Sequence, residues 1–223
     1  PGWWKTFEGY YQQWTRGIID SVVNALAEDE RRTFIWTEIS FFQRWWSDQS
    51  AVMQQKARSL AQSGRLEFVT GGWVANDEAN THFSDIILQL TEGSEWLQQN
   101  LGVKPVVSWS IDPFGHSPVM PWVLSQAGYN AMIINRVHQS TKTSFRENKK
   151  LEFVWRQNYQ HDVTPSFDMM THMLAYPLYD IPNTCGPDWD TCASFDFERD
   201  VATEITTQNV KKRSSDLLNQ YKQ

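Results

Sequence analysis

The sequence has only two cysteines in 223 residues, and it contains no long basic run and no long apolar run. So few cysteines exclude a disulfide-rich scaffold, and a formal net charge of −6 argues against nucleic acid as a partner. No stretch approaches the roughly 20 apolar residues that cross a bilayer. With 40% hydrophobic residues, the chain has the composition of a globular piece with one sizeable core.

The two cysteines, Cys185 and Cys192, have six residues between them, which is too long a spacing for a CxxC redox or zinc motif. A local disulfide is the natural interpretation, and it would indicate an oxidising compartment. Closing so short a loop stabilises a fold by at most about 2 to 3 kcal/mol. Two free thiols in a cytosolic loop are the alternative.

Aromatic residues are abundant, at 14% of the chain, and twelve of them are tryptophan. Indole rings commonly stack on the apolar faces of sugars, although they also pack in ordinary cores and interfaces. The composition is therefore a weak indication of carbohydrate binding.

Segments suited to strands alternate with segments suited to helices along the chain, which is typical of an α/β domain. Strands are predicted at residues 33–39, 66–74, 106–111, 131–137, 151–156 and 169–175. Helices are predicted at 18–31, 41–63, 81–100 and 118–127, and residues 198–223 have a polar helical pattern. Gly64, Gly102 and Gly128 lie where helix C-caps are expected. The simplest architecture is one largely parallel sheet, open or barrel-like, flanked by helices.

The most informative motif is IDPFGHS at residues 111–117, which places an acid and an imidazole in a turn directly after a predicted buried strand. Asp112 is thus expected at the carboxyl end of that strand, where α/β sheets and barrels bind their ligands. An aspartate before a proline also commonly shapes a turn or caps a helix, so a structural role is the alternative.

If the strands are parallel, their carboxyl ends gather polar and aromatic residues on one rim. These residues are Glu38, Ser40, Trp73, Asn76, Asp77, Glu78, His82, Asp112, Phe114, His116, Arg136, His138, Tyr179 and Asp180. Carboxylates and aromatic rings from separate strands suit the hydrolysis of a glycoside, with one carboxylate as nucleophile and another as acid/base. A metal-dependent hydrolase with another substrate would be served equally well by such a rim.

Six motifs resemble those of the glycoside hydrolase family 38 α-mannosidases, and they occur in the family's order. They are PGW at 1–3, FIWTEIS at 34–40, GGWV at 71–74, DEAN at 77–80, SIDPFGHS at 110–117 and YDIPNTCGPD at 179–188. The resemblance is closest to the Golgi branch of the family, through SPVMP at 117–121, RVH at 136–138 and the loop at 179–188. It implies that residues 1–223 are part of an N-terminal α/β catalytic domain, truncated at both ends.

Carried over by position, the resemblance implies that Asp112 is both the nucleophile of a retaining mechanism and a zinc ligand. Trp3 and Phe114 match positions that pack against the bound sugar. Arg136 matches a residue near the nucleophile and the substrate, and Tyr179 and Asp180 match hydrogen-bonding and stacking partners of the mannoside.

The resemblance also implies a disulfide between Cys185 and Cys192, as in the Golgi branch. His116 is expected to have a structural or supporting role, because the histidines that bind zinc in the family fall elsewhere. Asp77 and Glu78 are also expected to have structural or supporting roles.

The remaining groups of the family's site are expected outside this chain. A His and an Asp before Pro1 and a His beyond Gln223 would complete the Zn²⁺ site, and the acid/base aspartate would also follow Gln223. A lone carboxylate holds zinc weakly, since catalytic sites normally have three or more protein ligands. We therefore expect the 223 residues to be inactive without the other domains.

The expected function is that of a zinc-dependent retaining α-mannosidase that hydrolyses terminal α-linked mannose during N-glycan processing. Its expected partner is a mannose-containing N-glycan in the Golgi lumen, where a membrane anchor outside this chain would hold it. A lysosomal-type α-mannosidase of broad specificity and a non-catalytic carbohydrate-binding relative are the alternatives.

Overall fold

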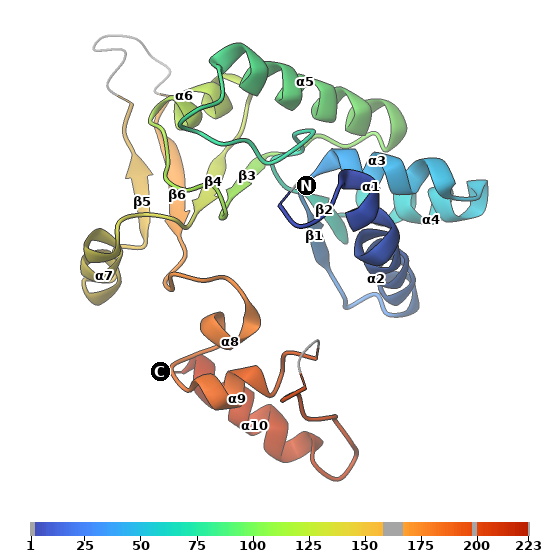
Figure 1. Ribbon diagram of the computed structural model, residues 1–223, viewed down its shortest axis with the longest axis vertical. Helices are drawn as coiled ribbons and strands as arrows, with labels where there is room; N and C mark the ends of the chain where they lie inside the picture. The colour runs from blue at the N-terminus through green and yellow to red at the C-terminus, as the bar shows by residue number, and fades with distance from the viewer. Residues whose placement is uncertain (1–2, 158–166, 198–199, 223) are drawn as a thin grey trace.

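The computed structural model describes residues 3–157, 167–197 and 200–222, and within these ranges six strands are flanked by helices (Figure 1). The strands are β1 (Phe34–Trp36), β2 (Leu66–Phe68), β3 (Val107–Ser110), β4 (Ala131–Ile134), β5 (Glu152–Trp155) and β6 (Met169–Met173). Each lies inside a predicted strand segment, because those segments are rich in the apolar and β-branched residues that strands favour. The predicted α/β class with largely parallel strands is confirmed.

The strands form two sheets, whereas the sequence predicted a single one. β1 and β2 form a parallel pair, and the second sheet has the order β3, β4, β6, β5. β3, β4 and β6 are parallel, and β5 pairs with β6 in the antiparallel direction at the edge. β5 and β6 are consecutive in the chain, and an antiparallel pair needs no helical crossover.

The two sheets meet at Thr70, where hydrogen bonds continue but the regular ladder does not. Thr70 N donates to Val107 O at 2.8 Å, and Trp109 N donates to Thr70 Oγ1 at 2.7 Å. Thr70 has a φ of 55°, which takes its backbone out of strand geometry. Its hydroxyl therefore accepts the bond that a strand carbonyl would otherwise accept, and the sheet divides there.

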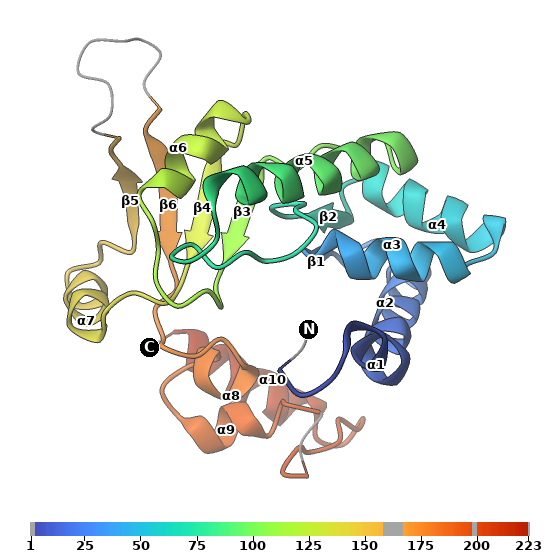
Figure 2. The same cartoon turned by 45° about the horizontal axis from the view of Figure 1, so that its top comes forward.

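Helices surround the sheets on several sides. The longer ones are α2 (Arg16–Glu28), α3 (Ile39–Asp48), α4 (Ala51–Gln62), α5 (Phe83–Asn100), α6 (Val119–Gln126), α7 (Gln139–Glu147) and α10 (Val210–Tyr221). The shorter ones are α1 (Phe7–Tyr10), α8 (Ile181–Thr184) and α9 (Trp189–Ala193), and a π-helical turn spans Tyr11–Thr15. Figure 2 shows α5 and α6 lying along one side of the strands, while α8, α9 and α10 lie beyond the carboxyl ends of β4 and β6. Gly64, Gly102 and Gly128 have the positive φ angles expected of C-caps.

The predicted helix over residues 41–63 is in fact two helices. α3 ends at Asp48, and α4 begins after Ser50, whose hydroxyl accepts a hydrogen bond from Met53 N at 3.3 Å. A serine in this position is a preferred N-cap and so starts a new helix. The apolar spacing runs through the break, and for that reason it did not reveal the boundary.

Two further helices differ from the sequence prediction. α7 was not predicted, because it has no apolar stripe, and Lys142 is its buried residue. The polar helical pattern over 198–223 corresponds only to α10, which begins at Val210. Residues 198, 199 and 223 of that pattern lie outside the described residues.

The buried apolar residues form two clusters. One cluster lies among α2, α3, α4 and β2 and includes Ile19, Phe42, Trp45, Leu60 and Phe68. The other lies between the four-stranded sheet and helices α5 and α6, and it includes Leu90, Leu124, Met132, Ile134 and Met173. The second cluster supports the strands whose ends carry the candidate site.

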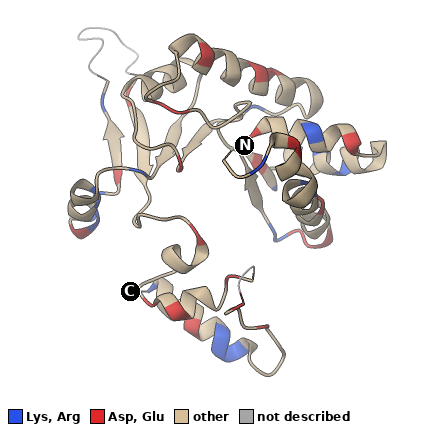
Figure 3. Cartoon of the chain, in the orientation of Figure 1, with Lys and Arg blue, Asp and Glu red and all other residues tan. Residues whose placement is uncertain are grey.

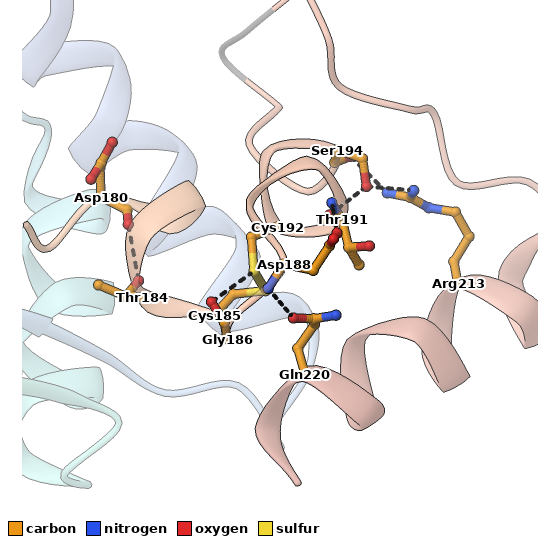
Figure 4. Close-up of a disulfide and its surroundings, with 10 residues drawn as sticks. All are labelled: Asp180, Thr184, Cys185, Gly186, Asp188, Thr191, Cys192, Ser194, Arg213 and Gln220. Atoms are coloured by element: carbon orange, nitrogen blue, oxygen red, sulfur yellow. Dashed lines mark hydrogen bonds between the residues drawn. A yellow bond between two sulfur atoms is a disulfide. The ribbon is translucent and has the colours of Figure 1, made fainter. Parts of the chain in front are cut away.

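The segment from α8 to α10 is held together by a disulfide and by polar contacts (Figure 4). Cys185, at the end of α8, is bonded to Cys192 in α9, so the predicted disulfide is present. Asp188 N donates to Gln220 Oε1 at 3.0 Å, which ties α10 to this loop. Arg213 Nη2 also donates to the carbonyl oxygen of Ser194 at 2.7 Å.

Acidic and basic residues are distributed over most of the helices (Figure 3). Many form local ion pairs, such as Arg44 with Glu8 at 2.9 Å and with Asp48 at 2.6 Å. In the part of the chain that the structure describes, no helix has both the length and the apolar character that spanning a membrane requires.

Candidate active site

Asp112 lies two residues beyond the end of β3, as the sequence predicted, and its side chain is 60% exposed. Arg136 Nη2 donates to Asp112 Oδ1 at 2.7 Å, and Tyr179 Oη donates to the same oxygen at 2.6 Å. Within the described residues, Asp112 Oδ2 has no hydrogen-bond donor. One oxygen of the carboxylate is therefore held by the protein, and the other is available to a ligand.

The surroundings of Asp112 favour its ionised form. Partial burial raises the pKa of the Asp112 carboxyl. Hydrogen bonds from Tyr179 and Arg136 and the positive charge of Arg136 lower the same pKa, and together they outweigh the effect of burial. The pKa is thus below its ordinary value. Burial and the hydrogen bond to Asp112 raise the pKa of Tyr179, so its phenol keeps its proton and remains a donor.

Arg136 also lies against two aromatic rings. Its guanidinium carbon is 5.0 Å from the centre of the Phe114 ring and 5.7 Å from the centre of the Tyr179 ring. Both distances are within the range of a cation–π interaction. Phe114 is 83% exposed and Tyr179 39% exposed, so flat apolar surface is available beside the carboxylate. We call Asp112, Phe114, Arg136 and Tyr179 the exposed layer.

Beneath the exposed layer, Glu78 holds the loop that carries Asp112. Its carboxylate accepts hydrogen bonds from Ser110 Oγ at 2.7 Å and from Ser117 N at 2.7 Å. His116 Nδ1 lies 3.2 Å from Glu78 Oε1, and the Glu78 side chain is only 2% exposed. Glu78 therefore contacts the loop on both sides of Asp112.

His116 continues this network to the next strand. Its Nε2 accepts a hydrogen bond from Asn135 N at 3.3 Å, which leaves the ring proton on Nδ1, facing Glu78. The His116 side chain is 4% exposed, and both of its ring nitrogens have partners. This geometry agrees with the supporting role that the resemblance implied for His116 and Glu78.

Two residues that the sequence did not single out complete the network. Asn135 follows β4, and Lys142 lies on α7; they are 0% and 1% exposed. Lys142 Nζ donates to Asn135 Oδ1 at 2.6 Å. Periodicity gave no sign of Lys142, because a buried lysine sits where an apolar residue is normally expected. We call Glu78, His116, Asn135 and Lys142 the buried layer.

Trp3 and Asp180, which the sequence also predicted for the site, make other contacts in the described part of the chain. Trp3 is 81% exposed and stacks on Trp4 with ring centres 4.5 Å apart, and in the described ranges no hydrogen bond or ring contact joins it to Asp112. Asp180 precedes α8, and its Oδ1 accepts a hydrogen bond from Asn183 Nδ2 at 2.8 Å. The substrate-binding roles of Trp3 and Asp180 remain predictions.

Several of the other rim residues have local structural partners. Asp77 Oδ1 accepts hydrogen bonds from Ala79 N and Asn80 N, at 2.7 and 2.8 Å. His82 and His138 are the N-caps of α5 and α7. These local contacts are a sufficient reason for these polar residues to stand at the strand ends, and no role in binding is needed to explain them.

A cavity of about 380 Å³ lies next to Arg136 and the loop at Gly115, between α7 and the sheet. Most of its lining is apolar, with Phe145, Phe153 and Trp155 among its walls. A sugar needs several hydrogen-bonding groups, so this cavity suits it poorly. The exposed layer itself is the better candidate for the site.

The described residues do not form a zinc site by themselves. No group of three or more His, Cys, Asp or Glu side chains in those ranges is arranged to hold a metal ion. Asp112 offers one carboxylate, whereas a catalytic zinc normally has three protein ligands. Any zinc bound at Asp112 would need ligands other than the described residues.

An ionised carboxylate at the end of a parallel strand, set among aromatic rings and hydrogen-bond donors, is typical of an α/β glycoside hydrolase domain. Comparison with known proteins agrees with this class. The sequence matches the domain described as "Glycosyl hydrolases family 38 N-terminal domain" over residues 1–223. The chain therefore belongs to glycoside hydrolase family 38.

Among its relatives, the chain is 47% identical to "Alpha-mannosidase 2" of Rattus norvegicus and 46% identical to that of Homo sapiens. The alignments cover 100% of this chain and 20% of each relative, so the chain spans about a fifth of their length. Among solved structures, an α-mannosidase from Enterococcus faecalis V583 is similar, with a TM-score of 0.61 and 14% identity over 78% of this chain and 18% of that chain. That likeness concerns the fold alone.

Proposed function

We propose that this chain forms part of the N-terminal catalytic domain of a retaining, zinc-dependent α-mannosidase. The observation that carries this proposal is the state of Asp112. Its carboxylate is exposed at the end of β3, and the hydrogen bonds it accepts from the described residues are both made by Oδ1. In a member of family 38, a carboxylate presented in this way is the natural nucleophile.

In the proposed reaction, the available oxygen of Asp112 bonds to the anomeric carbon of the mannoside as the bond to the leaving glycosidic oxygen breaks. An acid/base residue outside this chain gives the proton to the leaving oxygen. Water then adds to the anomeric carbon and gives a proton back to that acid/base residue as the bond to Asp112 breaks, so two inversions give net retention. Arg136 and Tyr179 orient the carboxylate and keep it ionised.

The substrate-binding surface would use the rings beside Asp112. Phe114 offers an exposed ring for the apolar face of the sugar, and Trp3 and Asp180 are proposed to contact the sugar once it is bound. Asp112 would also supply one oxygen to a zinc ion, whose other ligands lie outside this chain.

The biological substrate is proposed to be a mannose-containing N-glycan, processed in the Golgi lumen by a membrane-anchored protein. The high identity to proteins named α-mannosidase 2 supports this choice over a lysosomal-type enzyme. The disulfide between Cys185 and Cys192 is in keeping with an oxidising compartment.

The test is hydrolysis of an aryl α-mannoside by the zinc-loaded full-length protein and its Asp112→Asn variant. Loss of the nucleophile is expected to lower kcat by about three orders of magnitude or more. Asp85→Asn, which changes an exposed aspartate at the start of α5, is the matched control and should retain full activity.

Zinc content and product configuration are measured on the same samples. NMR should detect the α-anomer of mannose first, as retention requires. An inactive zinc-loaded wild-type protein would instead favour the non-catalytic sugar-binding relative, and a β-anomer formed first would exclude a retaining mechanism.

A further inference from the structure

Lys142 is an unusual residue in this molecule, because its ammonium group is almost fully buried and no carboxylate of the described ranges accepts a hydrogen bond from it. It is 1% exposed, and its Nζ donates to Asn135 Oδ1 at 2.6 Å, Leu174 O at 2.8 Å and Tyr176 O at 3.0 Å. An ammonium has three N–H donors, so all of them are used.

The three acceptors belong to the two chain segments that carry the donors to Asp112. Asn135 directly precedes Arg136 at the end of β4. Leu174 and Tyr176 follow β6 and lead to Tyr179. Lys142 thus ties the segment of Arg136 to the segment of Tyr179 at a point just before each side chain turns toward Asp112.

Asn135 strengthens the same connection. Its Nδ2 donates to Pro177 O at 3.3 Å, and its backbone N donates to His116 Nε2 at 3.3 Å. Since His116 is bonded to Glu78 beneath the Asp112 loop, the loops after β3, β4 and β6 are all joined through Asn135.

A merely structural role accounts poorly for a lysine at this place. Lys142 is the buried residue of α7, and an apolar side chain of similar length would attach the helix without desolvating a charge. Burial and the charges of Arg136 and Arg146 lower the pKa of Lys142 to about 8, so most molecules still carry the charge at pH 7. A buried charge in this setting fixes three carbonyl oxygens in position, which an apolar side chain cannot do.

We propose that Lys142 is a positioning residue that sets Arg136 and Tyr179 at hydrogen-bond distance from Asp112. It does not touch the substrate, and it acts through the side chain of Asn135 and through the backbone carbonyls of Leu174 and Tyr176. The consequence for catalysis depends on the proposed function of Asp112, whereas the geometric part does not.

The geometric part is tested by crystal structures of the full-length wild-type and Lys142→Met proteins. Methionine preserves the length of the side chain and removes its donors. The distances from Asp112 Oδ1 to Arg136 Nη2 and Tyr179 Oη, which are 2.7 and 2.6 Å here, are expected to exceed about 3.5 Å for at least one donor. Unchanged distances would overturn the proposal whether or not the protein is active.

The catalytic part is tested by a double-mutant cycle with Tyr179→Phe. Lys142→Met is expected to lower kcat about tenfold or more with a smaller change in KM. Because Lys142 would act through Tyr179 and Arg136, its effect should shrink to about threefold or less in the Tyr179→Phe background. Equal effects in both backgrounds would contradict the proposal.

Two controls separate this effect from general destabilisation. Leu60→Ala creates a cavity in the other core cluster, so its effect on kcat should be the same with and without Tyr179→Phe. If Lys142→Met does not fold, Asn135→Ala, which removes one of the three acceptors, is carried through the same structures and cycle. An inactive wild-type protein would refute the proposed function, and the crystal structures would still decide the geometric part.

Discussion

The exposed and buried layers at the ends of β3, β4 and β6 have similar polar residues but different surroundings. In the buried layer, the side chains of Glu78, His116, Asn135 and Lys142 are at most 4% exposed, and they bond to one another and to the backbone. In the exposed layer, Asp112 is 60% exposed, and one of its oxygens accepts no hydrogen bond within the described part of the chain.

The difference in exposure distinguishes residues that hold the fold from residues that can bind a ligand. The sequence alone placed both kinds on one rim. Polar atoms whose partners all lie within the chain fix its geometry, and they have little capacity left for a ligand. Exposed groups with unused hydrogen-bonding capacity contribute little to folding and are available for binding. Substitutions in the buried layer should therefore act through stability or through the position of the exposed layer, and substitutions in the exposed layer should lower activity directly.

Among substitutions that leave Asp112 itself in place, the largest effect is expected for Arg136→Met in the exposed layer. The change removes a charge-assisted hydrogen bond to Asp112, and kcat/KM for an aryl α-mannoside should fall about a hundredfold. The free energy of unfolding should change by only about 0.5 to 1 kcal/mol, because the Asp112 side of the pair is 60% exposed and water weakens the ion pair.

Arg31→Met is the matched control, because Arg31 also pairs with an aspartate, Asp29, but on a distant exposed surface. It should leave kcat/KM unchanged. A large drop in thermal unfolding midpoint for Arg136→Met, with kcat/KM intact, would reverse the assignment of the two layers.

In the buried layer, Glu78→Gln should lower stability by about 2 kcal/mol. The amide nitrogen would face Ser117 N–H or the proton of His116, so a donor would meet a donor in a buried place. Thermal unfolding measures the shift, with Glu67→Gln, an exposed glutamate of β2, as the control. Equal midpoints for the two variants would show that the Glu78 network does not stabilise the fold.

Much of the fold was predictable because segments rich in apolar residues alternate with helical ones, although the predicted strand over 66–74 is much longer than β2 (Leu66–Phe68). The division of the sheet at Thr70 was not predictable, since it depends on one left-handed residue and a side-chain hydrogen bond. Nor was α7, because it has no apolar stripe: it is held by the buried ammonium of Lys142, which bonds to the segments after β4 and β6, and by the contact of Phe145 with Phe153 of β5.

The site was predictable in part for a similar reason. Asp112 stands at the end of a recognisable strand, and Arg136 and Tyr179 follow other strands, so topology alone brings them together. Sequence position cannot tell which strand-end residues point to one another, and His82 and His138 turned out to cap helices. Much of the tryptophan content is likewise structural: Trp45 and Trp46 are buried, and Trp36, Trp73 and Trp96 pack against the same core cluster.

The pH dependence of stability offers a finer test of the buried layer. Because burial lowers the pKa of Lys142 from 10.5 to about 8, the folded state releases a proton that the unfolded state keeps between these values. The stability that this group contributes should therefore rise with pH from about 8 to 10.5, by at most about 1.4 kcal/mol per pH unit. Below pH 8, both states hold the proton and the contribution should be constant.

The measurement compares the thermal unfolding midpoints of wild-type and Lys142→Met proteins at pH 7 and pH 9.5. Their difference should shift in favour of the wild type at the higher pH. A difference that is the same at both pH values would mean that the folded protein does not lower the pKa of Lys142.

The smallest effect is expected for Phe114→Ala, and it tests the exposed layer at its most open point. Phe114 is 83% exposed, so its removal should change stability by less than about 0.5 kcal/mol. If its ring packs on the sugar, KM for the aryl α-mannoside should rise severalfold with kcat nearly constant, since stacking that is equal in the ground state and the transition state affects binding alone. Phe83→Ala, at an exposed phenylalanine that begins α5, should change neither KM nor kcat. A fall in kcat for Phe114→Ala would instead mean that the Phe114 ring holds Arg136 in place, because the guanidinium lies against that ring. Phe114 would then share the positioning role of the buried layer.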